Sequence, residues 1–408
     1  MTVDPTASRR RLILALTPGL IAFSMGQTVL FAIAGPAFRE IGLGEAQLGV
    51  IISAAALVFV LASGVWGQIA DRWGRRPTIL FGLLAYTLIS LAFAGVLQAG
   101  LGQALTPSLV FGLLLFLRML YAGLGAGVQP ASIALMADSS TAAERSSAVA
   151  VVGAAFSVGM VLGPATAAAL VGFGLLAPLY AIAGLALLGV LLAALLLSSN
   201  EHRPAETAIE GSTQRSGFAL LLAGALLLYV AMSSVQQTLA FNLQDLLGAD
   251  GETTARLTGF CFMCIALGTL TMQGVVIQRL RPSAPRLLFF GLPTILLALA
   301  TYATASGFPQ LLLASLFIGF GFGLTTPGLM AAASLLAGAQ EQGKIAGLVQ
   351  ATMAGGFIVG PITATYLYQI DRRYAGLLAL AATVLALLSI FAWLRRARSN
   401  PLPNAAAP

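Results

Sequence analysis

The chain is organised around apolar stretches of about 20 to 25 residues that recur along its whole length. A helix rises about 1.5 Å per residue, so such a stretch crosses a bilayer core of about 30 Å. The stretches are continuously apolar with no period of two, which favours helices over a transmembrane β-barrel. The sequence therefore predicts an all-α membrane protein with twelve transmembrane helices, at residues 12–37, 46–69, 77–98, 107–136, 147–171, 177–198, 217–242, 255–278, 287–305, 309–336, 346–369 and 374–394.

Composition supports a chain whose outer surface faces lipid. Hydrophobic residues make up 58% of its 408 residues and charged residues only 9%, whereas a soluble domain carries about 25% charged residues. The net charge of +7 does not predict nucleic-acid binding, because the basic residues flank the apolar spans instead of forming one basic face. The expected partners are a small-molecule substrate and the lipid bilayer, and we expect a monomer.

The distribution of positive charge predicts the orientation. The basic residues Arg9 to Arg11 precede an apolar run that is longer than the 7–15 residues of a signal-peptide core, so this run is interpreted as an uncleaved first span. With the N-terminus in the cytoplasm, sixteen of the 21 Lys and Arg residues lie on that side, and only Arg39, Arg256, Arg372 and Arg373 lie on the other. The positive-inside rule then predicts a multi-pass protein of a bacterial inner membrane with both termini cytoplasmic.

A repeat divides the chain into two halves. Five pairs of residues share one offset of 197 positions: Pro130 and Pro327, Glu144 and Glu341, Gly159 and Gly356, Gly163 and Gly360, and Pro164 and Pro361. Six spans per repeat give both copies the same orientation in the membrane. We therefore expect two six-helix bundles, residues 1–198 and 217–408, related by a pseudo-two-fold axis along the membrane normal. The polar segment 199–216, which holds the single His202, is expected to be a cytoplasmic linker.

The loop after the second span carries a charged motif. It reads Gly67-Gln-Ile-Ala-Asp71-Arg72-Trp-Gly74-Arg75-Arg76-Pro77. It resembles the signature loop G-x-L-A-D-R-x-G-R-[RK] of the major facilitator superfamily, with Ile69 as a conservative departure. Asp71 is expected to lie within reach of Arg72, Arg75 and Arg76 as a charged latch, while Gly67 permits close helix approach and Gly74 a tight turn.

Two further segments extend this gating region. Asp138, Glu144 and Arg145 resemble the superfamily's D-x(5)-E-R loop, which implies gating contacts, with a solvated loop as the alternative. The equivalent of the charged loop in the second half, residues 274–279, contains no acid, so the two halves are expected to be functionally unequal.

The fifth span contains Gly159-x-x-x-Gly163-Pro164, which resembles an element of the superfamily's antiporter branch. Alanines stand where that element ends in two glycines, and Gly356, Gly360 and Pro361 form a second copy. A proline inside a helix breaks a backbone hydrogen bond, and nearby glycines let another helix pack into the bend. The resemblance implies proton-coupled efflux by alternating access, driven by a proton gradient without a cofactor, and generic small-residue packing is the alternative.

Arg118 is the candidate for the substrate or proton pathway. It lies inside the fourth span, where an arginine costs at least about 2.5 kcal/mol, so it is expected to face a wet cavity. Many superfamily members carry an arginine here, and Tyr121 stands where a glutamine is common. A structural arginine bonded to carbonyl groups is the alternative. Further polar or aromatic residues could build a pocket or serve in packing: Gln27, Phe31, Gln236, Gln237 and Gln350.

The carboxylates indicate the cargo by their positions. All fourteen Asp and Glu residues lie in loops, termini or the last turn of a span. A central cation with no opposing acid favours an anionic or zwitterionic substrate such as a siderophore, or a neutral drug, over a cationic one. Uptake of a small organic anion by proton symport is the alternative.

A membrane-bound enzyme or receptor is disfavoured. The only cysteines, Cys261 and Cys264, lack partners for a metal site, and no extramembrane segment exceeds about twenty residues.

Overall fold

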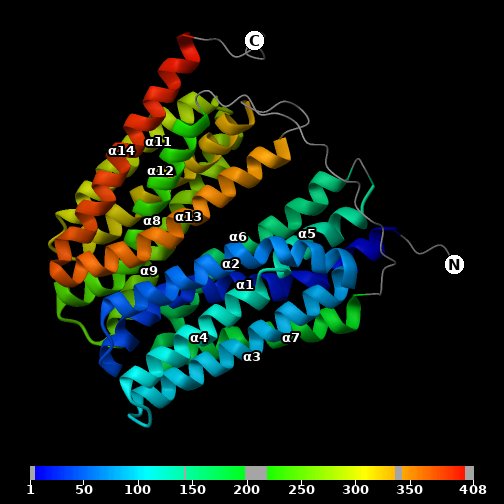
Figure 1. Ribbon diagram of the computed structural model, residues 1–408, viewed down its shortest axis with the longest axis horizontal. Helices are drawn as coiled ribbons and strands as arrows, with labels where there is room; N and C mark the ends of the chain where they lie inside the picture. Colours follow the sequence, from blue (N-terminus) through cyan, green and yellow to red (C-terminus); the bar gives the residue numbers. More distant parts are fainter. Residues whose placement is uncertain (1–4, 142–143, 198–217, 336–341, 400–408) are drawn as a thin grey trace. The chain divides into compact units, whose positions relative to one another are not determined.

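The computed structural model describes residues 5–141, 144–197, 218–335 and 342–399, which are mostly helical (Figure 1). In lipid every backbone N–H and C=O group must be bonded within the protein, and a continuous apolar segment achieves this as a helix. Twelve segments of the described chain are long and apolar enough to cross a membrane. The predicted spans are confirmed, with boundaries that differ by at most five residues.

The helices form two compact units, each described by itself. The first unit contains α1 (Pro5–Ile41), α2 (Glu45–Trp73), α3 (Arg75–Leu101), α4 (Pro107–Gly125), α5 (Val128–Asp138), α6 (Arg145–Leu170), the 3₁₀ turn η1 (Val171–Phe173) and α7 (Ala177–Leu196). The second contains α8 (Phe218–Leu247), most of α9 (Gly251–Thr271), the π-helical turn η2 (Met272–Ile277), α10 (Gln278–Leu280), α11 (Ala284–Ala303), α12 (Phe308–Leu335), α13 (Gln342–Ile370) and α14 (Arg372–Ser399).

The division between the units falls between α7 and α8, apart from residues 249–259, which belong to the first unit. The predicted linker 199–216, with His202, lies outside the described residues, and so does Glu341 of the repeat. The domain boundaries 1–198 and 217–408 stay a prediction.

In the first unit α6 packs closely on α1. An ideal Cβ built on Gly159 would lie 2.5 Å from the carbonyl oxygen of Ile21, and one on Gly163 would lie 2.7 Å from that of Met25. The Ser24 hydroxyl adds a hydrogen bond of 2.7 Å to the carbonyl oxygen of Phe156. Glycine is required at these positions because any side chain would collide with the backbone of α1.

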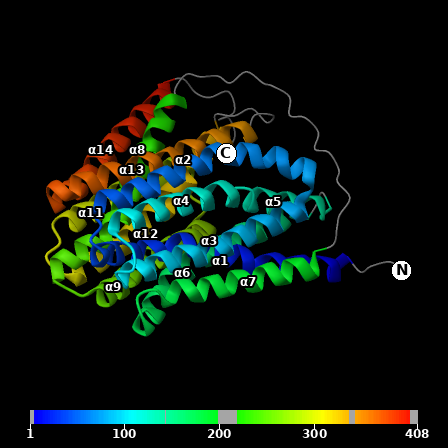
Figure 2. The ribbon, with the colours of Figure 1, turned by 60° about the horizontal axis from the view of Figure 1, so that its bottom comes forward.

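The second unit repeats this packing between α13 and α8, which run side by side in both ribbon views (Figures 1 and 2). A Cβ on Gly356 would lie 2.5 Å from Cβ of Tyr229, and one on Gly360 would lie 2.9 Å from the carbonyl oxygen of Val230. The Ser233 hydroxyl donates to the carbonyl oxygen of Gly356 at 2.9 Å. The glycines paired in the sequence repeat thus make equivalent contacts within each unit.

The fourth span differs from the continuous helix that the sequence predicts, because it is interrupted at Ala126 and Gly127 between α4 and α5. Pro130 has no N–H to offer the carbonyl group of Ala126, four residues earlier. The indole Nε1 of Trp66 donates at 2.6 Å to the carbonyl oxygen of Gly123, just before the break. A Cβ on Gly127 would lie 3.0 Å from the Trp66 ring, so the ring fills the space beside the break.

The two ends of α9 have different local causes. At its start the carboxylate of Asp250 accepts a hydrogen bond of 2.7 Å from the Thr253 N–H, which lowers the pKa of Asp250 by stabilising its charged form. At the other end the helix passes into the π-helical turn η2 and α10, and the chain then leaves the helix through Arg281 in the left-handed region, at φ +43°. A single π turn of this kind marks a local irregularity in the backbone ladder.

Candidate substrate and gating sites

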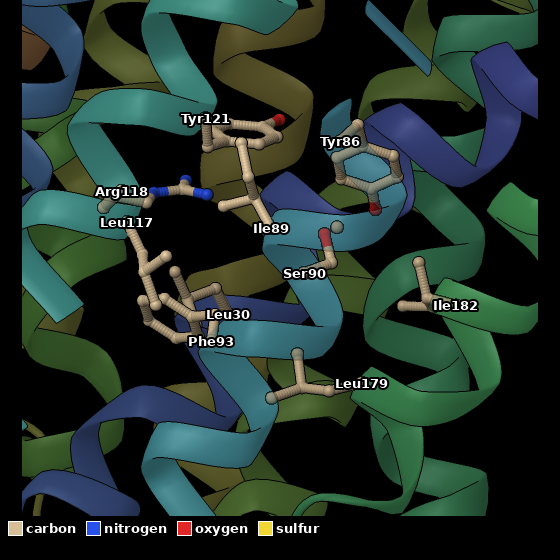
Figure 3. Close-up of a pocket in the computed structure, with 11 residues that line it drawn as sticks. Leu30, Tyr86, Ile89, Ser90, Phe93, Leu117, Arg118, Tyr121, Leu179 and Ile182 are labelled. Atoms are coloured by element: carbon tan, nitrogen blue, oxygen red, sulfur yellow. The ribbon is translucent and has the colours of Figure 1, made fainter. Parts of the chain in front are cut away.

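Arg118 of α4 extends into a cavity inside the first unit (Figure 3). Its Nη2 donates a hydrogen bond of 2.5 Å to Oε1 of Gln27 on α1. Its Cζ lies 4.6 Å from the centroid of the Tyr121 ring, one turn further along α4. The cation is therefore held by a cation–π contact and by an amide oxygen, two interactions that keep its positive charge unneutralised.

An aromatic cluster surrounds this cation. The ring centroids of Phe23, Tyr86 and Tyr121 lie 5.2 to 5.5 Å from one another, and the rings of Phe23 and Tyr121 are nearly parallel at 24°. The Tyr86 hydroxyl donates at 2.8 Å to the carbonyl oxygen of Ala22, and Gly26 leaves room for that hydroxyl because a Cβ there would collide with it. Phe23 and Tyr86 were not among the predicted pocket residues, because isolated aromatic residues in apolar spans form no pattern of their own.

The cavity beside Arg118 is small and has no acidic wall. Its volume is about 40 Å³, and its lining includes Tyr86, Ser90, Phe93 and Leu117 but no aspartate or glutamate. A water molecule needs about 10–15 Å³ of such space, so the cavity has room for about three waters. Its volume is far below the roughly 300 Å³ of a small-molecule site. The buried Nε of Arg118 and hydroxyl of Tyr121 have no hydrogen-bond partner of ordinary geometry among the described residues. They are polar atoms that water or a ligand can satisfy.

The structure brings together only three of the predicted pocket residues, namely Arg118, Tyr121 and Gln27. Phe31 lies half-buried on α1 and does not line the cavity. Gln236, Gln237 and Gln350 belong to the second unit, where the first two are buried on α8 and Gln350 is exposed on α13.

The second unit has its own polar and aromatic groups. The Oε1 atoms of Gln236 and Gln237 are buried without a partner among the described residues. Tyr229 makes edge-on contacts with Phe322 and Phe357, at centroid distances of 6.2 and 6.0 Å. These three aromatic residues were not among the predicted pocket residues.

At the predicted gate, Arg75 is the centre of an ion-pair network within the first unit. It pairs with Asp71 one turn earlier, and its Nε lies 3.4 Å from Oδ2 of Asp138 at the end of α5. The reach expected for Arg72 and Arg76 is not observed. Arg72 is exposed, and Arg76 donates at 3.0 Å to the carbonyl oxygen of Ala194 near the end of α7.

The other predicted gating residues are less engaged. The Glu144 carboxylate accepts a hydrogen bond of 3.1 Å from the Thr141 hydroxyl, and Arg145 is exposed. Gly74 has φ +93° between α2 and α3, so the tight turn expected there is observed and requires glycine. The close approach expected at Gly67 is not observed, because no described atom beyond its own stretch of α2 lies within 4 Å of its Cβ position.

Neutralising Asp71 tests whether the Asp71–Arg75–Asp138 network governs conformation or only stability. Exposed ion pairs contribute about 0–1 kcal/mol, and the side chain of Asp71 is 50% exposed, so Asp71→Asn is expected to leave the unfolding temperature nearly unchanged. We expect its initial transport rate in proteoliposomes to fall several-fold, because the charge that holds Arg75 in place is lost. Asp71→Glu, which keeps the charge, is the matched control. Equal rates for Asp71→Asn and the wild type would contradict a gating role.

Comparison with known proteins identifies the family. The family profile described as the Major Facilitator Superfamily matches residues 16–298 and 221–408. The chain belongs to the Major Facilitator Superfamily. Among its relatives are multidrug resistance protein 2 of Bacillus subtilis (strain 168), 27% identical over 88% of this chain and 89% of the relative, and the 3-(3-hydroxy-phenyl)propionate transporter of Escherichia coli (strain K12), 30% identical over 99% of this chain and 100% of the relative.

The fold is that of Major Facilitator Superfamily structures. A bacterial homologue of the human lysosomal transporter Spinster, solved in an inward-facing and unoccupied conformation, aligns with a TM-score of 0.73 and 16% identity over 96% of this chain and 97% of that one. The chain is thus a secondary transporter of the Major Facilitator Superfamily with twelve spans, and it is not an enzyme. Its cargo is a small molecule and its surroundings are the lipid bilayer.

Proposed function

We propose that this transporter exports a small organic anion or zwitterion by alternating access, in exchange for protons. The observation that carries the proposal is the buried Arg118 cation, which is held by Gln27 and Tyr121 and has no acid in its cavity. A carboxylate would replace the missing counter-charge in a low-dielectric site, whereas a cationic drug would meet repulsion there. A metabolite with carboxylate groups, such as a siderophore, matches the charge of this site, and a neutral drug is compatible with it.

Two observations support export as the direction of transport. Multidrug resistance protein 2 of Bacillus subtilis is a relative over most of the chain. Gly159, Gly163 and Pro164 of α6, with Pro164 inside the helix, form the antiporter-like element, for which we propose a kink, and Gly356, Gly360 and Pro361 repeat it in α13. We place the Asp71–Arg75–Asp138 network, with the neighbouring Glu144 and Arg145, at the gate. The proposal includes a monomer in the bacterial inner membrane with both termini cytoplasmic.

A second candidate is uptake of an organic anion by proton symport. It is favoured by the relative named as a 3-(3-hydroxy-phenyl)propionate transporter, whose cargo carries a carboxylate at neutral pH. Arg118 would serve uptake as well as export, so the two candidates share a substrate class and differ in direction.

Everted membrane vesicles from expressing cells separate these candidates. Respiration acidifies the lumen of everted vesicles, so a proton antiporter that exports anions would accumulate radiolabelled 3-(3-hydroxyphenyl)propionate in the lumen. A proton symporter would instead accumulate the probe in right-side-out vesicles. We expect accumulation in everted vesicles that an uncoupler abolishes. Ethidium serves as the cationic comparison, and equal transport of ethidium would refute the proposed charge preference.

A further inference from the structure

A second cavity lies at one end of the second unit, where α8 and α11 end and α14 begins. Its volume is about 610 Å³, within the range of about 300–1,000 Å³ for small-molecule sites. Its polar lining comes from three helix ends and one loop: Asn242, Tyr302, Thr304, Ser306, Arg372 and Arg373. None of the residues that line it is acidic.

The two arginines of this cavity are available to a ligand. Neither guanidinium takes part in an ion pair or a hydrogen bond with another described residue. Of the other two arginines predicted on the same side of the membrane, Arg39 pairs with Glu45 at 2.6 Å. The pair Arg372 and Arg373 therefore places unneutralised charge on the side where the positive-inside rule disfavours it.

The nearby acids are engaged elsewhere. Asp371 accepts a hydrogen bond of 2.8 Å from the backbone N–H of Arg373, which caps the start of α14. Asp245 on α8 accepts a hydrogen bond of 2.6 Å from the Tyr368 hydroxyl. Both carboxylates keep their negative charge, but neither lines the cavity, whose lining carries two cations, and the N-terminal end of the 28-residue helix α14 adds positive potential.

The hydroxyl groups of the lining are committed within the protein. Thr304 donates to the carbonyl oxygen of Ala300 at 2.9 Å, and Ser306 donates to Oε1 of Gln310 at 2.9 Å. The guanidinium groups are thus the main donors left for a ligand. Arginine forks match the two oxygens of a carboxylate or a phosphate.

We propose that this cavity binds an oxyanion, held by Arg372 and Arg373. A carboxylate of a transported solute and the phosphate of an anionic lipid share this chemistry. The site is distinct from the Arg118 cavity and depends neither on the direction of transport nor on the identity of the cargo.

The test uses the full-length protein in nanodiscs, with two probes. Binding of 3-(3-hydroxyphenyl)propionate is measured by calorimetry in phosphatidylcholine nanodiscs, and retention of phosphatidylglycerol is measured by native mass spectrometry. For the double variant Arg372→Gln/Arg373→Gln we expect either the affinity for the solute or the retention of phosphatidylglycerol to fall at least about tenfold, because charge-assisted hydrogen bonds are removed. The matched control Arg279→Gln/Arg286→Gln removes the same charge from exposed positions of the same unit.

The outcomes identify the source of the oxyanion. Loss of solute binding alone supports a transported anion, and loss of phosphatidylglycerol retention alone supports a lipid headgroup. Arg372→Lys/Arg373→Lys is expected to keep part of the affinity, which separates the role of the charge from a folding defect. The proposal is overturned when the wild type binds neither probe, or when the Arg372/Arg373 variant and its control behave alike. Because both readouts are binding and not transport, its failure is distinguishable from failure of the export assay.

Discussion

Arg118→Gln is expected to abolish transport while the protein stays folded. In the proposed mechanism Arg118 pairs with the negative charge of the substrate. Removing one partner of a buried charge pair costs about 2–5 kcal/mol, which corresponds to a loss of at least about 30-fold in transport of an anionic substrate. Stability should not fall, because an arginine in the span costs at least about 2.5 kcal/mol that a neutral glutamine avoids in part. The measurements are initial transport rates in proteoliposomes and the unfolding temperature in detergent.

Two further variants sharpen this test. Arg118→Lys keeps the charge but loses the planar stacking on Tyr121, 4.6 Å away, so it should retain an intermediate rate. Gln27→Ala removes only the amide acceptor of the 2.5 Å hydrogen bond and should reduce the rate less than Arg118→Gln does. Wild-type transport by Arg118→Gln would show that the arginine is structural, the alternative that its sequence position leaves open.

Gly163→Val is expected to destabilise the protein more than the substitutions at Asp71 and Arg118 do. A Cβ at Gly163 would lie 2.7 Å from the carbonyl oxygen of Met25, and a backbone atom cannot move aside as a flexible side chain can. Overpacking costs about 1–3 kcal/mol, and we expect the upper end of this range here. The readouts are the yield of monodisperse protein and its unfolding temperature.

The same helix supplies the matched control. Gly153 of α6 is exposed and has no described atom beyond its own stretch of α6 within 4 Å of its Cβ position, so Gly153→Val should behave like the wild type. In the second unit Gly360→Val should be destabilising and Gly347→Val neutral, for the same reasons on α13. Equal stability of Gly163→Val and Gly153→Val would contradict the close packing of α6 on α1.

Much of the fold follows from the sequence because lipid imposes a simple rule. A continuous apolar run must satisfy its own backbone, so counting such runs locates the helices. The break between α4 and α5 was missed, since a proline alone does not decide it. Pro327 lies inside the continuous helix α12, whereas before the equivalent Pro130 the helix is interrupted next to the hydrogen bond from Trp66 to the carbonyl oxygen of Gly123.

The candidate site was only partly predictable. Arg118 is conspicuous because its charge is costly inside a span, and Asp71 is conspicuous through its motif. Tyr86 and Phe23 complete the site through contacts between α1, α3 and α4 that no local pattern encodes. The preference of Arg75 for both Asp71 and Asp138 depends on where α5 ends, which is a tertiary property.

The glycine contacts of α6 with α1, and of α13 with α8, have a mechanical consequence. At Gly163 and Gly360 the facing helix presents backbone oxygens, 2.7 and 2.9 Å from the Cβ positions, and only the short hydroxyl side chains of Thr28 and Ser233, so these contacts contain no long flexible side chain that could rearrange. We therefore expect each helix pair to move as a rigid unit. We expect bending within a unit to occur where the helical hydrogen-bond pattern is already irregular, at Ala126–Gly127 in the first unit and at Met272–Ile277 in the second.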